Sequence, residues 1–185
     1  MSSTTPTLSQ TLKNLQTAYN GESNARVRYL AFGEKAKAEG YLRAANLFRA
    51  AARAEEIHAA GLARVITRLG ATPEAHIETP QVGTTAENLA AAKKGEEYER
   101  DVMYPDFIHE AEASGETAAV RIFRLAAAAE AVHAALYGAA LAALDAQRAA
   151  VVFYVCPVCG EVTDDPELHN CPICNAPSEK FETIQ

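Results

Sequence analysis

Two Glu-x-x-His pairs are the residues of this sequence best suited to metal chemistry. The first pair is Glu55 and His58, and the second is Glu130 and His133. Each pair lies at the centre of an otherwise apolar stripe that advances by alternating steps of four and three residues, which predicts one face of an α-helix. Burying such groups without a partner costs on the order of several kcal/mol. The pattern therefore predicts one metal centre shared by both pairs.

Two further stripes supply the other ligands that such a centre needs. The stripe over residues 15–36 carries a single charge, Glu22, and the stripe over residues 89–103 carries Glu96 and Glu99. A Glu from each of two helices, with Glu-x-x-His from each of the other two, is the inward-facing ligand set of di-iron and di-manganese carboxylate bundles. These donors suit iron, manganese or zinc, and the order of affinities alone does not choose among them.

The two halves of this region repeat each other, which indicates an internal duplication. The interval from Glu22 to Glu96 is only one residue shorter than the interval from Glu55 to Glu130. Advancing from Ala25 by the interval that joins Glu22 to Glu96 reaches Glu99. Glu99 is therefore an extra carboxylate that breaks the internal symmetry of the predicted site.

Four helices must position these stripes. Short turns ending in Gly40 and Gly115 predict that the two helices of each half are antiparallel neighbours. Residues 70–85, rich in Thr and Pro, predict one long crossover between the second and third helices. We expect Pro105 to kink the third helix just beyond its ligands, because proline removes a backbone donor. Residues 1–148 are predicted to form an all-α, up-down-up-down four-helix bundle.

A second metal site is predicted from the four cysteines. Cys156 and Cys159 form one C-x-x-C knuckle, and Cys171 and Cys174 form a second one, with eleven residues between the two knuckles. Paired knuckles indicate a tetrathiolate site and not disulfides. The knuckles alone suit a structural zinc as well as a one-iron electron-transfer site, since both use tetrahedral sulfur. We predict a small metal-knuckle domain over residues 149–185.

Composition and charge limit the function classes further. The formal net charge of -7 gives no support for a nucleic-acid partner, which would favour a basic face. The sequence has no run of eighteen apolar residues, so no membrane partner is expected. The N-terminal segment lacks the basic and apolar layout of a targeting signal. These features predict a soluble cytoplasmic protein.

Taken together, the motifs of this chain resemble the rubrerythrin family. The resemblance extends from the first helix to the C-terminus, and it implies a ferritin-like bundle followed by a rubredoxin-like domain. The matching segments are Gly21-Glu22-Ser23 with Ala25-Arg26 and Tyr29, Glu55-x-x-His58, Gly95-Glu96-x-x-Glu99 with Met103-Tyr104-Pro105, Glu130-x-x-His133, and the paired cysteine knuckles.

The resemblance also implies an activity and a set of site residues. The activity is that of a non-haem di-iron peroxidase, which reduces hydrogen peroxide to water and protects against oxidative stress. Glu55 and Glu130 would bridge the irons, and Tyr29 and Tyr104 would hydrogen-bond to ligand carboxylates. The implied di-iron ligands are Glu22, Glu55, His58, Glu96, Glu99, Glu130 and His133, and the implied ligands of the rubredoxin-like iron are Cys156, Cys159, Cys171 and Cys174.

Electrons in that family come from an external donor, a reductase or a rubredoxin. They reach the rubredoxin-like iron and pass to the di-iron site, commonly in the partner subunit of a head-to-tail homodimer. The extra carboxylate suggests a ligand exchange, in which the neutral His58 suits the diferrous state and the anionic Glu99 suits the diferric state. Two alternatives stay open: a ferroxidase or iron-handling protein, and a metal-binding protein with a structural zinc ribbon. The sequence assigns no role to His169, which lies between the knuckles.

Overall fold

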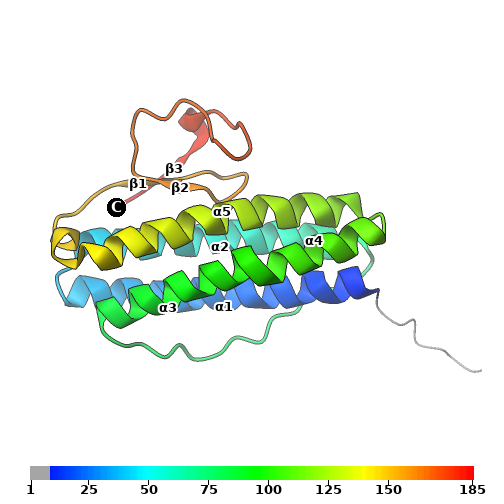
Figure 1. The fold of residues 1–185 in the computed structure, drawn as a ribbon, viewed down its shortest axis with the longest axis horizontal. Coiled ribbons are helices and arrows are strands. Elements are labelled where there is room, and N and C mark those ends of the chain that lie inside the picture. Colours follow the sequence, from blue (N-terminus) through cyan, green and yellow to red (C-terminus); the bar gives the residue numbers. More distant parts are fainter. Residues whose placement is uncertain (1–8) are drawn as a thin grey trace, which may run out of the picture.

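Four long helical segments lie side by side in the computed structural model, which describes residues 9–185 (Figure 1). Their bounds are α1 Gln10–Ala38, α2 Leu42–Arg68, α3 Thr85–Tyr98 continued by α4 Tyr104–Ala113, and α5 Thr117–Ala142. This arrangement confirms the predicted four-helix bundle. Most of the N-terminal segment in which we expected no targeting signal, residues 1–8, lies outside the described residues.

The connections are those that the turn residues predict. Gly40 and Gly115 adopt positive φ angles of 82° and 72°, which a glycine accommodates at no steric cost. Residues 71–84 form the long crossover and contain no helix or strand. Thr84 ends this crossover with a capping box, in which its side chain accepts from the Glu87 N–H and the Glu87 side chain accepts from the Thr84 N–H. α3 therefore begins where its first apolar residues can face the core.

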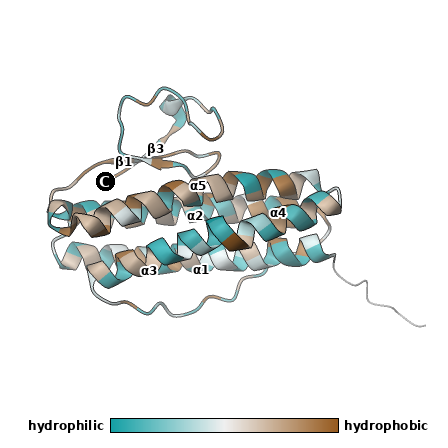
Figure 2. Ribbon diagram, in the orientation of Figure 1, coloured by the Kyte–Doolittle hydropathy of each residue, from teal (hydrophilic) through white to brown (hydrophobic). Residues whose placement is uncertain are grey.

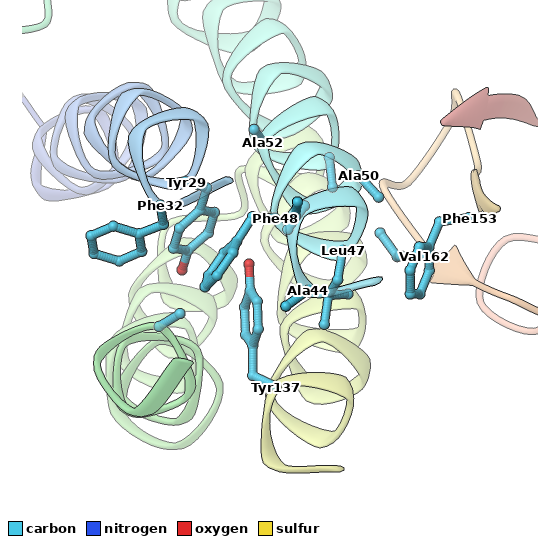
Figure 3. Packing of buried hydrophobic residues seen from close by; sticks show 14 of the residues in the cluster. Tyr29, Phe32, Ala44, Leu47, Phe48, Ala50, Ala52, Tyr137, Phe153 and Val162 are labelled. Carbon is cyan, nitrogen blue, oxygen red and sulfur yellow. The ribbon is translucent and has the colours of Figure 1, made fainter. Parts of the chain in front are cut away.

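The core of the bundle consists of two apolar clusters that lie above and below the predicted ligands. The first includes an aromatic stack in which the Tyr137 ring centroid lies 5.6 Å from that of Tyr29 and 5.3 Å from that of Phe48 (Figure 3). The second is built around Tyr104 and Phe123. Because the ligand positions of α1, α2 and α5 fall between the two clusters, the site is closed at both ends by packed side chains.

The last helix of the bundle, α5, is markedly apolar along much of its length (Figure 2). It is the one described helix that could span a membrane by length and composition. Its inward face nevertheless carries the fully buried Glu130 and His133, and it packs against α2, α3 and α4. Its hydrophobicity is that of a core helix of the bundle.

The third helix is interrupted by a π-helical turn, η1, over Glu99–Met103. The Tyr104 N–H donates to the Glu99 carbonyl, five residues back, so this turn is wider than an α-helical turn. Pro105, which has no N–H to donate, follows at the start of α4. The disturbance that we expected as a kink at Pro105 is thus a π turn just before it.

The π turn accounts for the unequal repeat distances. The interval from Tyr29 to Tyr104 is one residue longer than the interval from Glu22 to Glu96. The second half therefore gains one residue between Glu96 and Tyr104, which is where the π turn lies. A π turn accommodates one additional residue in a continuing helix, so the inward faces on both sides of it keep their alignment with α1.

The predicted small C-terminal domain is present, and it contains a three-stranded sheet. Its strands are β1 Phe153–Val155, β2 Val162–Thr163 and β3 Glu182–Ile184, all antiparallel, in the order β2-β1-β3. A short helical turn, η2 Leu144–Arg148, precedes it, and the predicted boundary at residues 148 and 149 falls in the connection to β1.

The sheet domain packs against the outer side of α2. Phe153 and Val162 are buried in the same cluster as the inner side of that helix (Figure 3). Arg53 of α2 donates from Nε and Nη2 to the Glu182 carboxylate at 2.6 and 2.8 Å, a bidentate pair. A second ion pair joins Arg43 to Asp164. These contacts fix the position of the domain on the bundle.

Candidate metal centres

The structure brings six of the predicted ligands into one buried cluster. Their side chains are at most 1% exposed. They form two overlapping groups in which one ligand atom per residue lies within 4.8 Å of the others. The groups are Glu22, Glu55, His58 and Glu130, and Glu55, Glu96, Glu130 and His133. Glu55 and Glu130 belong to both groups, which is the arrangement that two bridging carboxylates require.

Several buried atoms of this site form no hydrogen bond of acceptable geometry among the described residues, although some lie close to a group of opposite charge. They are Glu22 Oε2, Glu55 Oε1, Glu96 Oε2, both carboxylate oxygens of Glu130, and His133 Nδ1. Leaving buried charged groups unsatisfied is costly, and two cations placed among these atoms would remove that cost. The donor set of carboxylate oxygens and imidazole nitrogens therefore fits two iron, manganese or zinc ions.

The electrostatics of the cavity also indicate bound cations. Burial raises the pKa of the Glu22 carboxyl well above its usual range, and the Glu55 carboxylate raises it further. Burial and the carboxylates of Glu55 and Glu130 raise the pKa of Glu96 to about 8. Without cations, this cavity would therefore hold protons at carboxyl groups that are ionised in water.

The two histidines oppose part of this negative charge. Burial disfavours imidazolium, but the Glu130 and Glu55 carboxylates together outweigh it and raise the pKa of His58, whose Nδ1 lies 3.0 Å from both Glu55 Oε2 and Glu130 Oε1. Burial likewise acts against His133, but its Nδ1 lies 2.8 Å from Glu130 Oε2 and its pKa is also raised. Metal ions at these nitrogens would supply the positive charge that the carboxylates attract.

Two tyrosines hold the outer carboxylates. The Tyr29 hydroxyl donates to Glu96 Oε1 at 2.5 Å, and the Tyr104 hydroxyl donates to Glu22 Oε1. Each tyrosine thus belongs to one half of the repeat and holds a carboxylate of the other half. In both carboxylates the second oxygen, Oε2, has no partner among the described residues and is free to bind an ion.

Glu99 lies beside the six buried ligands and not within either group. It is partly buried at the first residue of the π turn. Burial and the Glu96 carboxylate raise the pKa of Glu99 well above its usual range. Glu99 is therefore close enough to interact with the site electrostatically while remaining outside both groups.

The four cysteines form the second predicted site. All four are free, and their sulfurs lie within 4.8 Å of one another. Gly160 and Asn175 follow the knuckles with positive φ angles of 78° and 61°, and their N–H groups turn back to the carbonyls of Cys156 and Cys171. A hydrogen bond from the Cys159 thiol lowers the pKa of Cys156 to about 5. A thiolate cluster of this kind fits one tetrahedral metal ion.

The two sites are joined by a pair of hydrogen bonds that the sequence did not predict. His58 Nε2 lies 2.9 Å from the Cys159 carbonyl oxygen, and His133 Nε2 lies 3.0 Å from the Gly160 carbonyl oxygen. A carbonyl only accepts, so each imidazole donates its Nε2–H and leaves Nδ1 for an ion in the cavity. The first knuckle is thus held directly against both predicted histidine ligands of its own chain.

Glu161 is a buried carboxylate that the sequence pattern did not indicate. It follows Gly160, is 4% exposed, and its Oε2 has no hydrogen-bond partner among the described residues. Burial raises its pKa to about 7, against a lowering influence from His133. It belongs to no helical stripe, so only the packing of the domain on the bundle reveals it. His169, by contrast, is exposed.

Comparisons with known proteins agree with this geometry. A family profile described as Rubrerythrin matches residues 13–141, and one described as Rubrerythrin, rubredoxin-like domain matches residues 154–182. Nigerythrin of Nitratidesulfovibrio vulgaris is 39% identical over 92% of this chain and 85% of its own length. Rubrerythrin-2 of Clostridium acetobutylicum is 34% identical over 92% of this chain and 94% of its own length.

Solved structures show the same fold. Nigerythrin in its fully reduced, all-ferrous state superposes with a TM-score of 0.89 at 34% identity, over 99% of this chain and 91% of that one. A bacterioferritin of Mycobacterium tuberculosis has a TM-score of 0.67 at 21% identity over 74% of this chain and 86% of that one. The second similarity shows the ferritin-like fold of the bundle.

Proposed function

This chain belongs to the rubrerythrin family, and on that premise we propose that it is a di-iron peroxidase that reduces hydrogen peroxide to water in the cytoplasm. The observation that carries the proposal is the contact between the two sites. A tetrathiolate knuckle that hydrogen-bonds to both histidines of a dinuclear carboxylate cavity suits a site that is reduced repeatedly. A store for iron would have no need of such a contact.

We propose that seven residues hold the two irons. One iron would be held by Glu22 and His58, the other by Glu96 and His133, and Glu55 and Glu130 would be shared by both. Glu99 would replace His58 as a ligand in the oxidised state. When bound, the irons would supply one electron each to the peroxide and act as Lewis acids toward its oxygens. A third iron would be held by the four cysteines.

The residues around the irons would hold the ligands in place and exclude water. Tyr29 and Tyr104 fix one oxygen of Glu96 and of Glu22, so that the remaining oxygen of each is available to an ion. The apolar clusters above and below the site would shield the buried ligands from bulk water, which strengthens the charge interactions among them.

Electrons would enter at the cysteine site from an external reductase or rubredoxin. The carbonyls of Cys159 and Gly160 then connect the site to His58 and His133 through two hydrogen bonds. These bonds lie within one chain. A head-to-tail homodimer with electron transfer between subunits stays a prediction.

The metal content of the protein and the number of electrons used for each peroxide together test this function. Protein purified without air should contain iron at both sites by elemental analysis and Mössbauer spectroscopy, with a visible thiolate-to-iron absorption. With an electron donor it should consume one hydrogen peroxide for every two electrons and form water alone. Oxidation of added ferrous iron that is then retained, without donor-linked peroxide consumption, would support the ferroxidase alternative. A colourless protein with zinc at the cysteines would support the zinc ribbon.

Glu99→Ala tests the proposed ligand exchange. Six ligands remain, and Ala25 already occupies the corresponding place of the first half, so two irons should still bind. The oxidised site loses an anionic ligand, and we therefore expect a raised reduction potential and a reaction with peroxide slower by on the order of 10². Stopped-flow oxidation of the diferrous protein by peroxide measures this rate.

Glu97→Ala is the matched control for that experiment. Glu97 is the neighbouring carboxylate of α3, and it forms an ion pair with Lys93 away from the cavity. Its loss should leave the rate unchanged. If Glu99→Ala also reacts at the wild-type rate, Glu99 is a carboxylate that lines the site and takes no part in ligand exchange.

A further inference from the structure

A basic groove lies between α2 and α5 beside the cysteine domain. Arg64 and Arg68 of α2 and Arg121 of α5 line a cavity of about 520 Å³. All three side chains are exposed, and none forms an ion pair with any residue in the described part of the chain. On a protein with a net charge of -7, three unpaired cations on one groove make a local positive field.

The groove reaches the first cysteine knuckle. Val158, which lies between Cys156 and Cys159, lines the same cavity and is 44% exposed. An apolar residue at this place offers a partner a contact next to two metal-binding sulfurs. The groove thus combines exposed arginines with one exposed apolar side chain, Val158, next to the cysteine site at which electrons would enter.

A second cavity continues the groove to the other knuckle. It has a volume of about 800 Å³ and shares Arg121 and Leu125 with the first. Pro172 and Ile173, which lie between Cys171 and Cys174, also line it. The two cavities together lead from the arginines to both knuckles, so one partner seated there would contact both sides of the tetrathiolate site.

We propose that this groove docks an acidic electron-donor protein that reduces the tetrathiolate iron. The inference rests on the proposed function, since it names the surface at which the external donor binds. The step transfers one electron: the reduced donor is oxidised, the ferric tetrathiolate becomes ferrous, and no bond forms or breaks. Opposite charges would steer the donor to the knuckles and make association dependent on ionic strength.

The test compares two triple variants with the same change in net charge. The first is Arg64→Gln, Arg68→Gln and Arg121→Gln, in the groove. The control is Lys13→Gln, Lys37→Gln and Lys94→Gln, which removes three exposed cations from α1 and α3. Freeze-quench Mössbauer spectroscopy of protein loaded with the Mössbauer-active iron isotope measures the rate at which a purified, reduced, acidic rubredoxin of natural iron content reduces the tetrathiolate iron. At low salt we expect the groove variant to react at least about tenfold more slowly, and the control to react like the wild type.

Binding provides a readout that needs no electron transfer. Calorimetry with oxidised rubredoxin and zinc-substituted protein should show weaker binding for the groove variant alone, and the difference should shrink at high salt. Circular dichroism establishes that both variants fold. Equal affinities of the two triple variants would overturn the proposal. A groove variant that changes only its oligomeric state would also overturn it, in favour of a second copy of this chain.

The binding experiment separates this inference from the proposed function. Weaker rubredoxin binding by the groove variant supports the docking surface even if the wild type reduces no peroxide. Conversely, a wild type that reduces peroxide with a small uncharged reductant, together with unchanged rubredoxin binding in the groove variant, leaves the peroxidase proposal standing and removes the docking surface.

Discussion

Replacing Glu130 by alanine should remove both irons together. Its two oxygens form no hydrogen bond of acceptable geometry among the described residues, and the residue belongs to both ligand groups, so neither metal position is complete without it. The substitution also removes the carboxylate oxygens that lie 3.0 Å from His58 Nδ1 and 2.8 Å from His133 Nδ1. Elemental analysis and Mössbauer spectroscopy of protein prepared without air should therefore find no dinuclear iron in Glu130→Ala, with the cysteine site still loaded.

Two controls make this prediction specific. Glu55→Ala should behave in the same way, because Glu55 also belongs to both groups. Glu96→Ala removes a buried carboxylate that belongs to only one group, so it should weaken one metal position more than the other. Two irons per bundle in Glu130→Ala would show that this residue does not bridge the metals.

Gly160→Ala should separate the cysteine domain from the bundle. A Cβ atom at this position would lie 2.3 Å from His58 Nε2, which is far inside contact distance. The backbone φ of 78° adds strain, since alanine rarely adopts it. Both hydrogen bonds to the histidines should be lost, and with them donor-linked peroxide turnover. The diferrous bundle, reduced chemically, should still react once with peroxide.

Gly115→Ala is the control that isolates the contact. Gly115 has a φ of 72°, so alanine there carries a similar backbone cost, but nothing lies within 4 Å of the added Cβ. We expect a loss of stability in both variants and a loss of electron transfer in Gly160→Ala alone. Stopped-flow spectroscopy measures the rate at which the tetrathiolate iron reduces the dinuclear site in each variant. Equal rates in the two variants would contradict the role of the contact.

The ligand stripes could be predicted from the sequence because their signal is local. Residues such as Glu55 and His58 fall on one helical face by spacing alone, and an apolar face must be buried. The positive φ of Gly160 was likewise foreseeable from the knuckle that precedes it. Few arrangements of four helices bury all four stripes against one another, so the same residues also predicted the fold.

The contact between the two sites could not be predicted in this way. His58 and Cys159 are 101 residues apart, and no periodicity links a loop carbonyl to a helix side chain. Glu161 is buried only because the domain packs on the bundle, so its sequence neighbours gave no indication. The π turn was predictable only in part. The unequal repeat distances show that the second half has one additional residue, but only the backbone hydrogen bond from Tyr104 to Glu99 shows where in the helix that residue is accommodated.

The π turn that accommodates the additional residue makes the two ends of the dinuclear site different. In an uninterrupted repeat the two metal positions would be interchangeable, and an incoming molecule could not distinguish them. The π turn itself has no counterpart in the first half, and it begins at Glu99, where the matching position of the first half is the small Ala25. The two metal positions therefore have unequal surroundings, and the two oxygens of an incoming peroxide would meet different side chains.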